Sequence, residues 1–173
     1  MSTLLTNQIQ SLTGKKILGT TGSILQVVQT VKSDTFSGVA NGTELAVTGL
    51  TASITPTAAT NKIWIIGHIM YSSTGTTYGG WVKRGTTNIG LGSTGTGQQL
   101  VSMGMALATD GNQSNTFVYS YLDSPNSTSA QTYAFYVNND NTNAIYINRS
   151  VNDSANSTGK RGISTITLIE VVA

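Results

Sequence analysis

Apolar residues alternate with small polar residues through most of the chain from residue 24 onward. In residues 130–138 (AQTYAFYVN), for example, Tyr133, Phe135 and Val137 fall on one face. This period of two is typical of a β-strand with one buried face. Residues 62–73 (KIWIIGHIMYSS) are instead almost continuously apolar, which predicts a strand that is buried on both faces.

Nine or ten such segments follow one another, separated by turn-forming sequences. Pro56 ends one segment, and Gly49 interrupts the same segment in a way that predicts a β-bulge. No segment has the pattern of a helix between parallel strands, so the class is all-β, an antiparallel sandwich or jelly roll. We predict strands over residues 24–36, 44–55, 62–73, 78–85, 87–92, 99–108, 116–124, 130–138, 144–150 and 162–172.

The first 23 residues differ from the rest and predict an N-terminal arm before a domain of residues 24–173. Leu5, Ile9 and Leu12 fit one face of a helix, but threonines and glycines interrupt the pattern. An arm with regular leucines and no core of its own is expected to pack on another chain. The candidate residues for attachment to that other chain are the apolar residues of the arm, Leu4, Leu5, Ile9, Leu12, Ile17 and Leu18.

The composition predicts a surface that is covered by other protein. The chain has 28 threonines, 19 serines, 19 glycines and 14 asparagines, and only 9% of its residues are charged, against about 25% in an average domain. Nine basic residues are too few for the basic stripe that nucleic acid requires. No apolar stretch approaches the roughly 20 residues that cross a bilayer, and the start lacks the pattern of a secretory signal. Cysteine is absent, which excludes disulfides and thiolate chemistry.

The residue types that carry catalysis are scattered, so we expect no enzyme and no cofactor. His68, the single histidine, lies inside an apolar run without a G-x-S-x-G elbow, and we interpret it as a strand residue that is hydrogen-bonded or faces a subunit interface. Residues 138–143 (NNDNTN) could offer oxygen ligands to calcium, but they lack the D-x-D-x-D-G pattern. A polar hairpin turn is the preferred interpretation.

The large aromatic residues divide into expected core and expected contact residues. Trp64, Phe117 and Phe135 lie in alternating strands and are expected in the core. The segment YGGWVKRG combines aromatic with basic side chains, which suits a surface contact. The candidate receptor-contact residues are Tyr78, Trp81, Lys83 and Arg84.

An ordered series of short motifs resembles small virion structural and fibre-like proteins of bacteriophages of marine and aquatic bacteria. The series reads LLTNQIQSLTGKKIL, LQVVQTVKSDTFS, GLTASITPTAATNKI, LDSPNSTSAQTY and STITLIEV, and it spans nearly the whole chain. The resemblance implies a jelly roll akin to complement-globular-head and tumour-necrosis-factor-like domains, commonly a homotrimer on the virion surface. It implies no enzyme chemistry. Such fibre proteins usually carry a long stalk, whereas here about 23 residues precede the head.

We therefore expect a non-enzymatic phage virion protein, a homotrimeric fibre or appendage head that contacts the host. Its expected partners are copies of itself, capsid or tail proteins through the arm, and a glycan or protein of the host surface. One alternative is a capsid decoration protein that cements the phage head, which the short arm favours. A further alternative is a carbohydrate-binding module, because threonine-rich sandwiches with exposed aromatic residues bind sugars.

Overall fold

The computed structural model describes residues 19–73, 78–93, 96, 100–103, 112–139, 142–155 and 159–173. They form ten β-strands and no helix, so within the described chain no helix could cross a membrane. The strands are β1 (Ile24–Lys32), β2 (Phe36–Gly38), β3 (Leu45–Ile54), β4 (Lys62–Ser73), β5 (Tyr78–Arg84), β6 (Thr87–Ile89), β7 (Asn115–Asp123), β8 (Gln131–Asn139), β9 (Ile145–Ile147) and β10 (Ser164–Val171).

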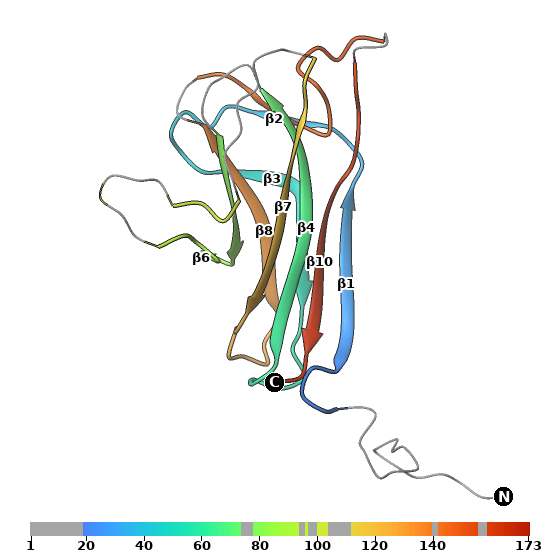
Figure 1. The fold of residues 1–173 in the computed structure, drawn as a ribbon, viewed down its shortest axis with the longest axis vertical. Helices are drawn as coiled ribbons and strands as arrows, with labels where there is room; N and C mark the ends of the chain where they lie inside the picture. Colours follow the sequence, from blue (N-terminus) through green and yellow to red (C-terminus); the bar gives the residue numbers. More distant parts are fainter. Residues whose placement is uncertain are drawn as a thin grey trace, which may run out of the picture.

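The strands form two antiparallel sheets that pack face to face (Figure 1). One sheet runs β1-β10-β4, with β7 on the other edge of β4; the second runs β3-β8-β5-β6. The short β2–β9 pair extends the first sheet beyond the end of β10, where β9 pairs with residues 71–73 of β4. Without that pair, eight strands remain whose order is that of a jelly roll. The expected all-β jelly-roll sandwich is confirmed.

Most strand bounds follow the sequence pattern. β4 covers residues 62–73 as predicted, and Gly49 has a φ of +82° at a register shift in β3, which confirms the bulge. The predicted strand over residues 24–36 divides into β1 and β2 around residues 33–35. Of the strand expected over residues 99–108, the described part is residues 100–103, which joins β5 through a single bridge between Gly80 and Met103.

The core lies between the two sheets and is built from the inward-facing side chains of every long strand. Tyr71 stacks on Phe117 with ring centroids 4.1 Å apart, and Phe135 is fully buried. Gly67 in the middle of β4 makes room for Phe135, because a Cβ there would lie 2.8 Å from the Phe135 ring. Phe117 and Phe135 are therefore core residues, as expected.

Two of the buried charged side chains, Glu170 and Lys32, lie at opposite ends of the β1–β10 ladder. Glu170 accepts hydrogen bonds from Gln26 Nε2 (2.6 Å), the Thr57 backbone N (2.6 Å), Thr57 Oγ1 (2.8 Å) and Asn61 Nδ2 (2.6 Å). Lys32 donates to Asp34 Oδ2 at 2.8 Å. Burial alone raises the pKa of Glu170, but the hydrogen bonds outweigh burial and hold the pKa below its ordinary value.

The expectation that β4 is buried on both faces is wrong. Its side chains alternate between buried and partly exposed, and Trp64 is 39% exposed. Trp64 pairs with Ile169 and Leu122 across the sheet and so points away from the core. The apolar run arises because β4 carries apolar residues on both faces while the protomer covers one of them.

Candidate interaction surface

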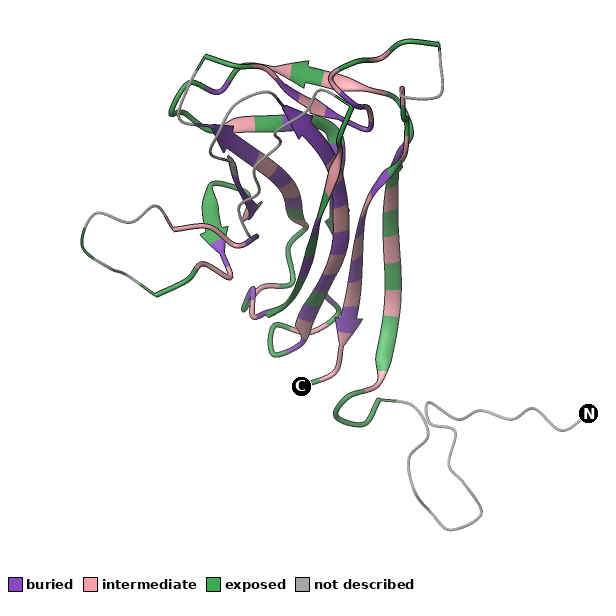
Figure 2. Ribbon diagram, turned by 45° about the horizontal axis from the view of Figure 1, so that its top comes forward, coloured by how far each residue is buried: buried purple, intermediate pink, exposed green. Residues whose placement is uncertain are grey.

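The side chains that point away from the core on β1, β10, β4 and β7 form a largely apolar surface, here called the apolar outer face. The strand register places them in three rows across the sheet. The rows are Val27–Ile169–Trp64–Leu122, Gln29–Thr167–Ile66–Ser120 and Val31–Thr165–His68–Val118. The first row has no polar residue. Figure 2 shows exposed and half-buried positions along β1, whereas β4 alternates mostly between buried and half-buried positions.

The apolar outer face is exposed to an extent that is unusual for large apolar side chains. Val118 is 71% exposed, Val27 57%, Leu122 50% and Trp64 39%. Trp64 is held in place because its Nε1 donates to Ser120 Oγ at 3.0 Å. Exposed apolar side chains that gather on one sheet face, as in the first and third rows here, favour an interaction site over ordinary surface.

The apolar outer face carries almost no charge. In its three rows the single ionisable side chain is His68, whose Nε2 lies 3.2 Å from the carbonyl oxygen of Ile163 and whose Nδ1 lies 3.1 Å from Thr165 Oγ1. A carbonyl only accepts, so Nε2 donates to the Ile163 carbonyl. The interpretation of His68 as a hydrogen-bonded strand residue is confirmed.

The outer face of the other sheet has the opposite character. Its exposed positions on β3 include Thr48, Thr51 and Ser53, and Ser53 Oγ lies 2.7 Å from Thr132 Oγ1 on β8. Lys83 on β5 pairs with Glu44 there. One side of the sandwich thus carries mainly small polar side chains and an ion pair at these positions, whereas seven of the twelve side chains in the three rows on the other side are apolar.

The candidate receptor-contact residues do not form one patch. Lys83 pairs with Ala134 and Arg84 with Tyr133 in neighbouring register positions, so their side chains leave β5 on opposite faces. Lys83 lies 4.9 Å from the Tyr136 ring. Tyr78 pairs through its backbone with Asn139. Receptor contact by Tyr78, Trp81, Lys83 and Arg84 stays a prediction.

The expectation that Trp81 is exposed is wrong, because its side chain is only 6% exposed. The reason is local. A Cβ on Gly79, which lies on the same face of β5 as Trp81, would be 2.6 Å from Val101 Cγ1, so the segment of residues 100–103 lies against that face. Trp81, which was expected at the surface, is therefore buried, and Trp64, which was expected in the core, is exposed.

Arg84 belongs to a cluster that closes one end of the sandwich. Its Nε lies 3.1 Å from Asp123 Oδ2, and its Nη1 donates to the Pro125 carbonyl at 3.1 Å. Tyr133 donates to the same Asp123 oxygen at 2.8 Å. Burial, followed by this hydrogen bond, raises the pKa of Tyr133. The cluster joins β5, β7 and β8 and has a structural role.

The two remaining sequence candidates lie partly or wholly outside the described residues. All the candidate arm residues lie outside the described part of the chain, namely Leu4, Leu5, Ile9, Leu12, Ile17 and Leu18. Residues 140–141 of the NNDNTN segment also lie outside it. In the described part of that segment, the Asn139 side chain accepts from the Asn41 backbone N at 3.0 Å and donates to the Asn143 carbonyl. Calcium binding there stays a prediction.

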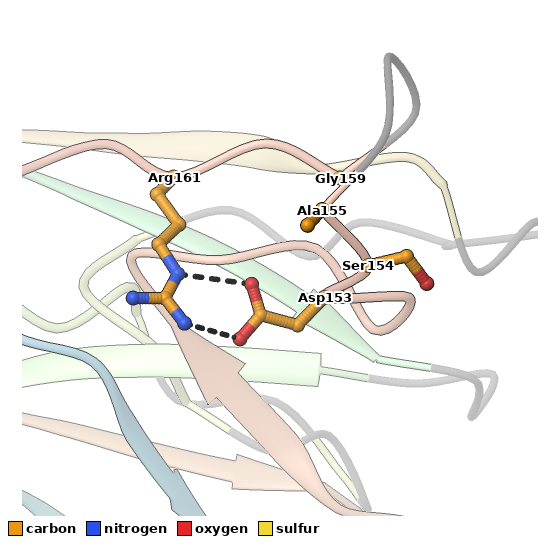
Figure 3. A pocket seen from close by; sticks show the side chains of 5 residues that line it. All are labelled: Asp153, Ser154, Ala155, Gly159 and Arg161. Carbon is orange, nitrogen blue, oxygen red and sulfur yellow. Dashed lines mark hydrogen bonds and ion pairs between the residues drawn. The ribbon is translucent and has the colours of Figure 1, made fainter.

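A shallow pocket near the β9–β10 connection is lined by Asp153, Ser154, Ala155, Gly159 and Arg161 (Figure 3). Arg161 donates to both oxygens of Asp153, from Nε at 3.0 Å and from Nη2 at 2.8 Å. The hydrogen bond from Arg161 lowers the pKa of Asp153. Since Arg149 also contacts Asp153, the carboxylate is occupied by structural ion pairs.

Sequence reasoning missed the apolar outer face, although a signal for it was present. Residues 63–66 are apolar at both strand parities, which requires cover on both faces. The pattern does not say whether that cover comes from the same chain or from another one. The same limit applies to Val118 and Leu122 on β7.

No protein-family model matches the chain, and no curated protein matches it significantly. Among solved structures, the chain is similar to infectious bursal disease virus of the Gt strain, with 12% identity and a TM-score of 0.43 over 86% of this chain. It is also similar to the Gx strain, with 13% identity and a TM-score of 0.41 over 86%. The matches span 38% and 37% of those viral chains.

Proposed function

We propose that this chain is a non-enzymatic phage virion surface protein, a homotrimeric fibre or appendage head that contacts the host. The observation that carries the proposal is a sandwich with a complete core and one apolar outer face. Such a face favours a protein that works in an assembly, because an exposed patch of this kind is an aggregation hazard for a free monomer. The resemblance of the ordered motifs to phage fibre-like proteins supports a virion as that assembly.

The low charge of the chain supports the same proposal. Interface cores are depleted of charged residues, and many of the charged side chains of this sandwich pair with one another. Lys83 with Glu44, Arg84 with Asp123, and Arg161 with Asp153 are examples. Charged side chains in such ion pairs stabilise the protomer, and few basic side chains remain for electrostatic recognition of nucleic acid.

The experiment that tests the proposal is immunogold labelling of purified phage particles, combined with binding of the purified chain to host cells and to capsids. We expect gold on the particle surface and labelling of host cells by the chain. Labelling of capsids without labelling of cells would replace the fibre head with the decoration protein. Absence of the chain from particles would overturn the virion proposal.

A matched pair of variants in the full chain tests the attachment arm. Ile9→Asp places a charge among the arm leucines, and Thr51→Asp places the same charge on the polar outer face. We expect Ile9→Asp to reduce incorporation into particles at least tenfold and Thr51→Asp to leave it unchanged. Equal incorporation of both variants would remove the arm from the proposal.

A further inference from the structure

We infer that the apolar outer face is the surface on which a second copy of this chain docks. The inference rests on the proposed function and deepens it, because it names the surface through which the protomers associate. Its centre is the row Val27–Ile169–Trp64–Leu122.

The size of the apolar outer face fits an interface between proteins. Four strands spaced about 4.8 Å apart and paired over about nine residues give a face of roughly 20 by 30 Å. Covering this face removes on the order of 600 Å² from each protomer, close to the roughly 800 Å² per partner of a standard interface. A small ligand would leave most of it exposed.

The charge of the apolar outer face favours a copy of the same chain over a charged partner. His68 is the single ionisable side chain in the three rows, and its two ring nitrogens contact the Ile163 carbonyl and Thr165 Oγ1. Lys62, at the margin, donates to Ser124 at 2.8 Å. No acidic side chain lies in the three rows. Two copies can therefore approach without bringing like charges together at the centre, whereas a strongly charged partner finds no counter-charges there.

The side chains also suit close packing between flat sheets. Three of the exposed apolar residues at the two edges, Val27 and Val31 on β1 and Val118 on β7, are β-branched and stiff. Little side-chain entropy is lost when such residues are covered. Trp64 supplies the large, fixed aromatic ring that commonly carries most of the binding energy at interface centres.

The absence of cysteine from the chain makes the test direct. Val118→Cys places one thiol on the apolar outer face, and Thr51→Cys places one on the polar outer face as the matched control. The solution mass of each full-length variant is measured by light scattering, and its labelling rate with a maleimide is measured at the same concentration. We expect both variants to be oligomers, and the thiol of Val118→Cys to react at least ten times more slowly than the thiol of Thr51→Cys.

A second pair of variants distinguishes a docked copy on the apolar outer face from cover by residues 1–18 and from association through another surface. Val118→Asp is expected to lower the solution mass to that of the 18.1 kDa protomer, and Thr51→Asp to leave the oligomer intact. Circular dichroism verifies that both fold, which the 71% exposure of Val118 favours.

An oligomer in which the thiols of Val118→Cys and Thr51→Cys react at equal rates would show association through another surface. A monomer in which the thiol of Val118→Cys is protected would assign the face to residues 1–18. Both outcomes overturn the inference and leave the virion proposal to the particle experiment.

Discussion

At the scale of single residues, Gly67 shows how one missing side chain sets the spacing of the two sheets. A Cβ at this position would lie 2.5 Å from the Thr165 carbonyl oxygen and 2.8 Å from the Phe135 ring. Neither the β10 backbone nor a fully buried ring has free space to move into. Gly67 therefore admits Phe135 to the centre of the core.

We expect Gly67→Ala to lower the free energy of unfolding by about 2–3 kcal/mol, because the added methyl group overpacks the core. Gly92→Ala is the control, since a Cβ there meets nothing within 4 Å. Urea denaturation measures both. Adding Phe135→Leu to Gly67→Ala is expected to cost less than the sum of the single substitutions. Equal costs for Gly67→Ala and Gly92→Ala would contradict this account.

At the scale of elements, Glu170 ties β10 to β1 and to the turn between β3 and β4. Its carboxylate accepts from Gln26, Thr57 and Asn61. These hydrogen bonds hold the folded pKa below the ordinary value of 4.5, so the folded state binds fewer protons than the unfolded chain. The resulting stability is present above about pH 4.5 and is lost as the pH falls through the folded pKa.

We expect Glu170→Gln to lower the free energy of unfolding at neutral pH by about 2–3 kcal/mol, because hydrogen bonds to a charged group are lost. Below pH 4.5 the difference in the free energy of unfolding between the unchanged chain and Glu170→Gln becomes smaller. Glu44→Gln is the control, since the Glu44 carboxylate contacts Lys83 at the surface and its substitution costs less than about 1 kcal/mol. Denaturant titrations at a series of pH values measure this difference in the free energy of unfolding. A difference that stays constant with pH would refute stabilisation by the charged Glu170 carboxylate.

The strands themselves could be predicted from the sequence, because a strand with one buried face repeats with a period of two. The bounds of β4 and the Gly49 bulge followed from local signals of this kind. Which strand face the protomer covers could not be predicted, because that depends on pairing between distant segments. Trp64 and Trp81 were therefore assigned to the wrong environments. The burial of Glu170 was missed for the same reason, since its partners Gln26, Thr57 and Asn61 become neighbours only through folding.

At the scale of the whole molecule, the two outer faces differ in a way that sets the response to salt. His68 is the single ionisable side chain in the three rows of the apolar outer face, whereas the polar outer face carries the Lys83–Glu44 ion pair. Apolar association does not depend on charge attraction and is strengthened by salts that are excluded from protein surfaces.

We expect the oligomer to keep its mass when sodium chloride is raised from about 0.05 to about 0.5 M, although screening between exposed charges becomes much stronger over that range. Sedimentation velocity at both salt concentrations measures the result. Thr51→Asp serves as the control, because it adds charge without touching the apolar outer face. Dissociation at high salt would mean that ion pairs hold the protomers together.

The place where the chain enters β1 also has a mechanical consequence. Gly22 donates to the Val172 carbonyl at 2.8 Å and Val172 donates to the Ser23 carbonyl at 2.9 Å, so the start of β1 and the end of β10 lie side by side at one end of the sandwich (Figure 1). Pulling these two ends apart would break the ladder one pair at a time, like a zipper. Pulling residue 19 against the loops at the far end would instead shear all the β1–β10 hydrogen bonds at once. A head that is tethered before residue 19 and holds its target at the far end would therefore carry tension along its stronger direction.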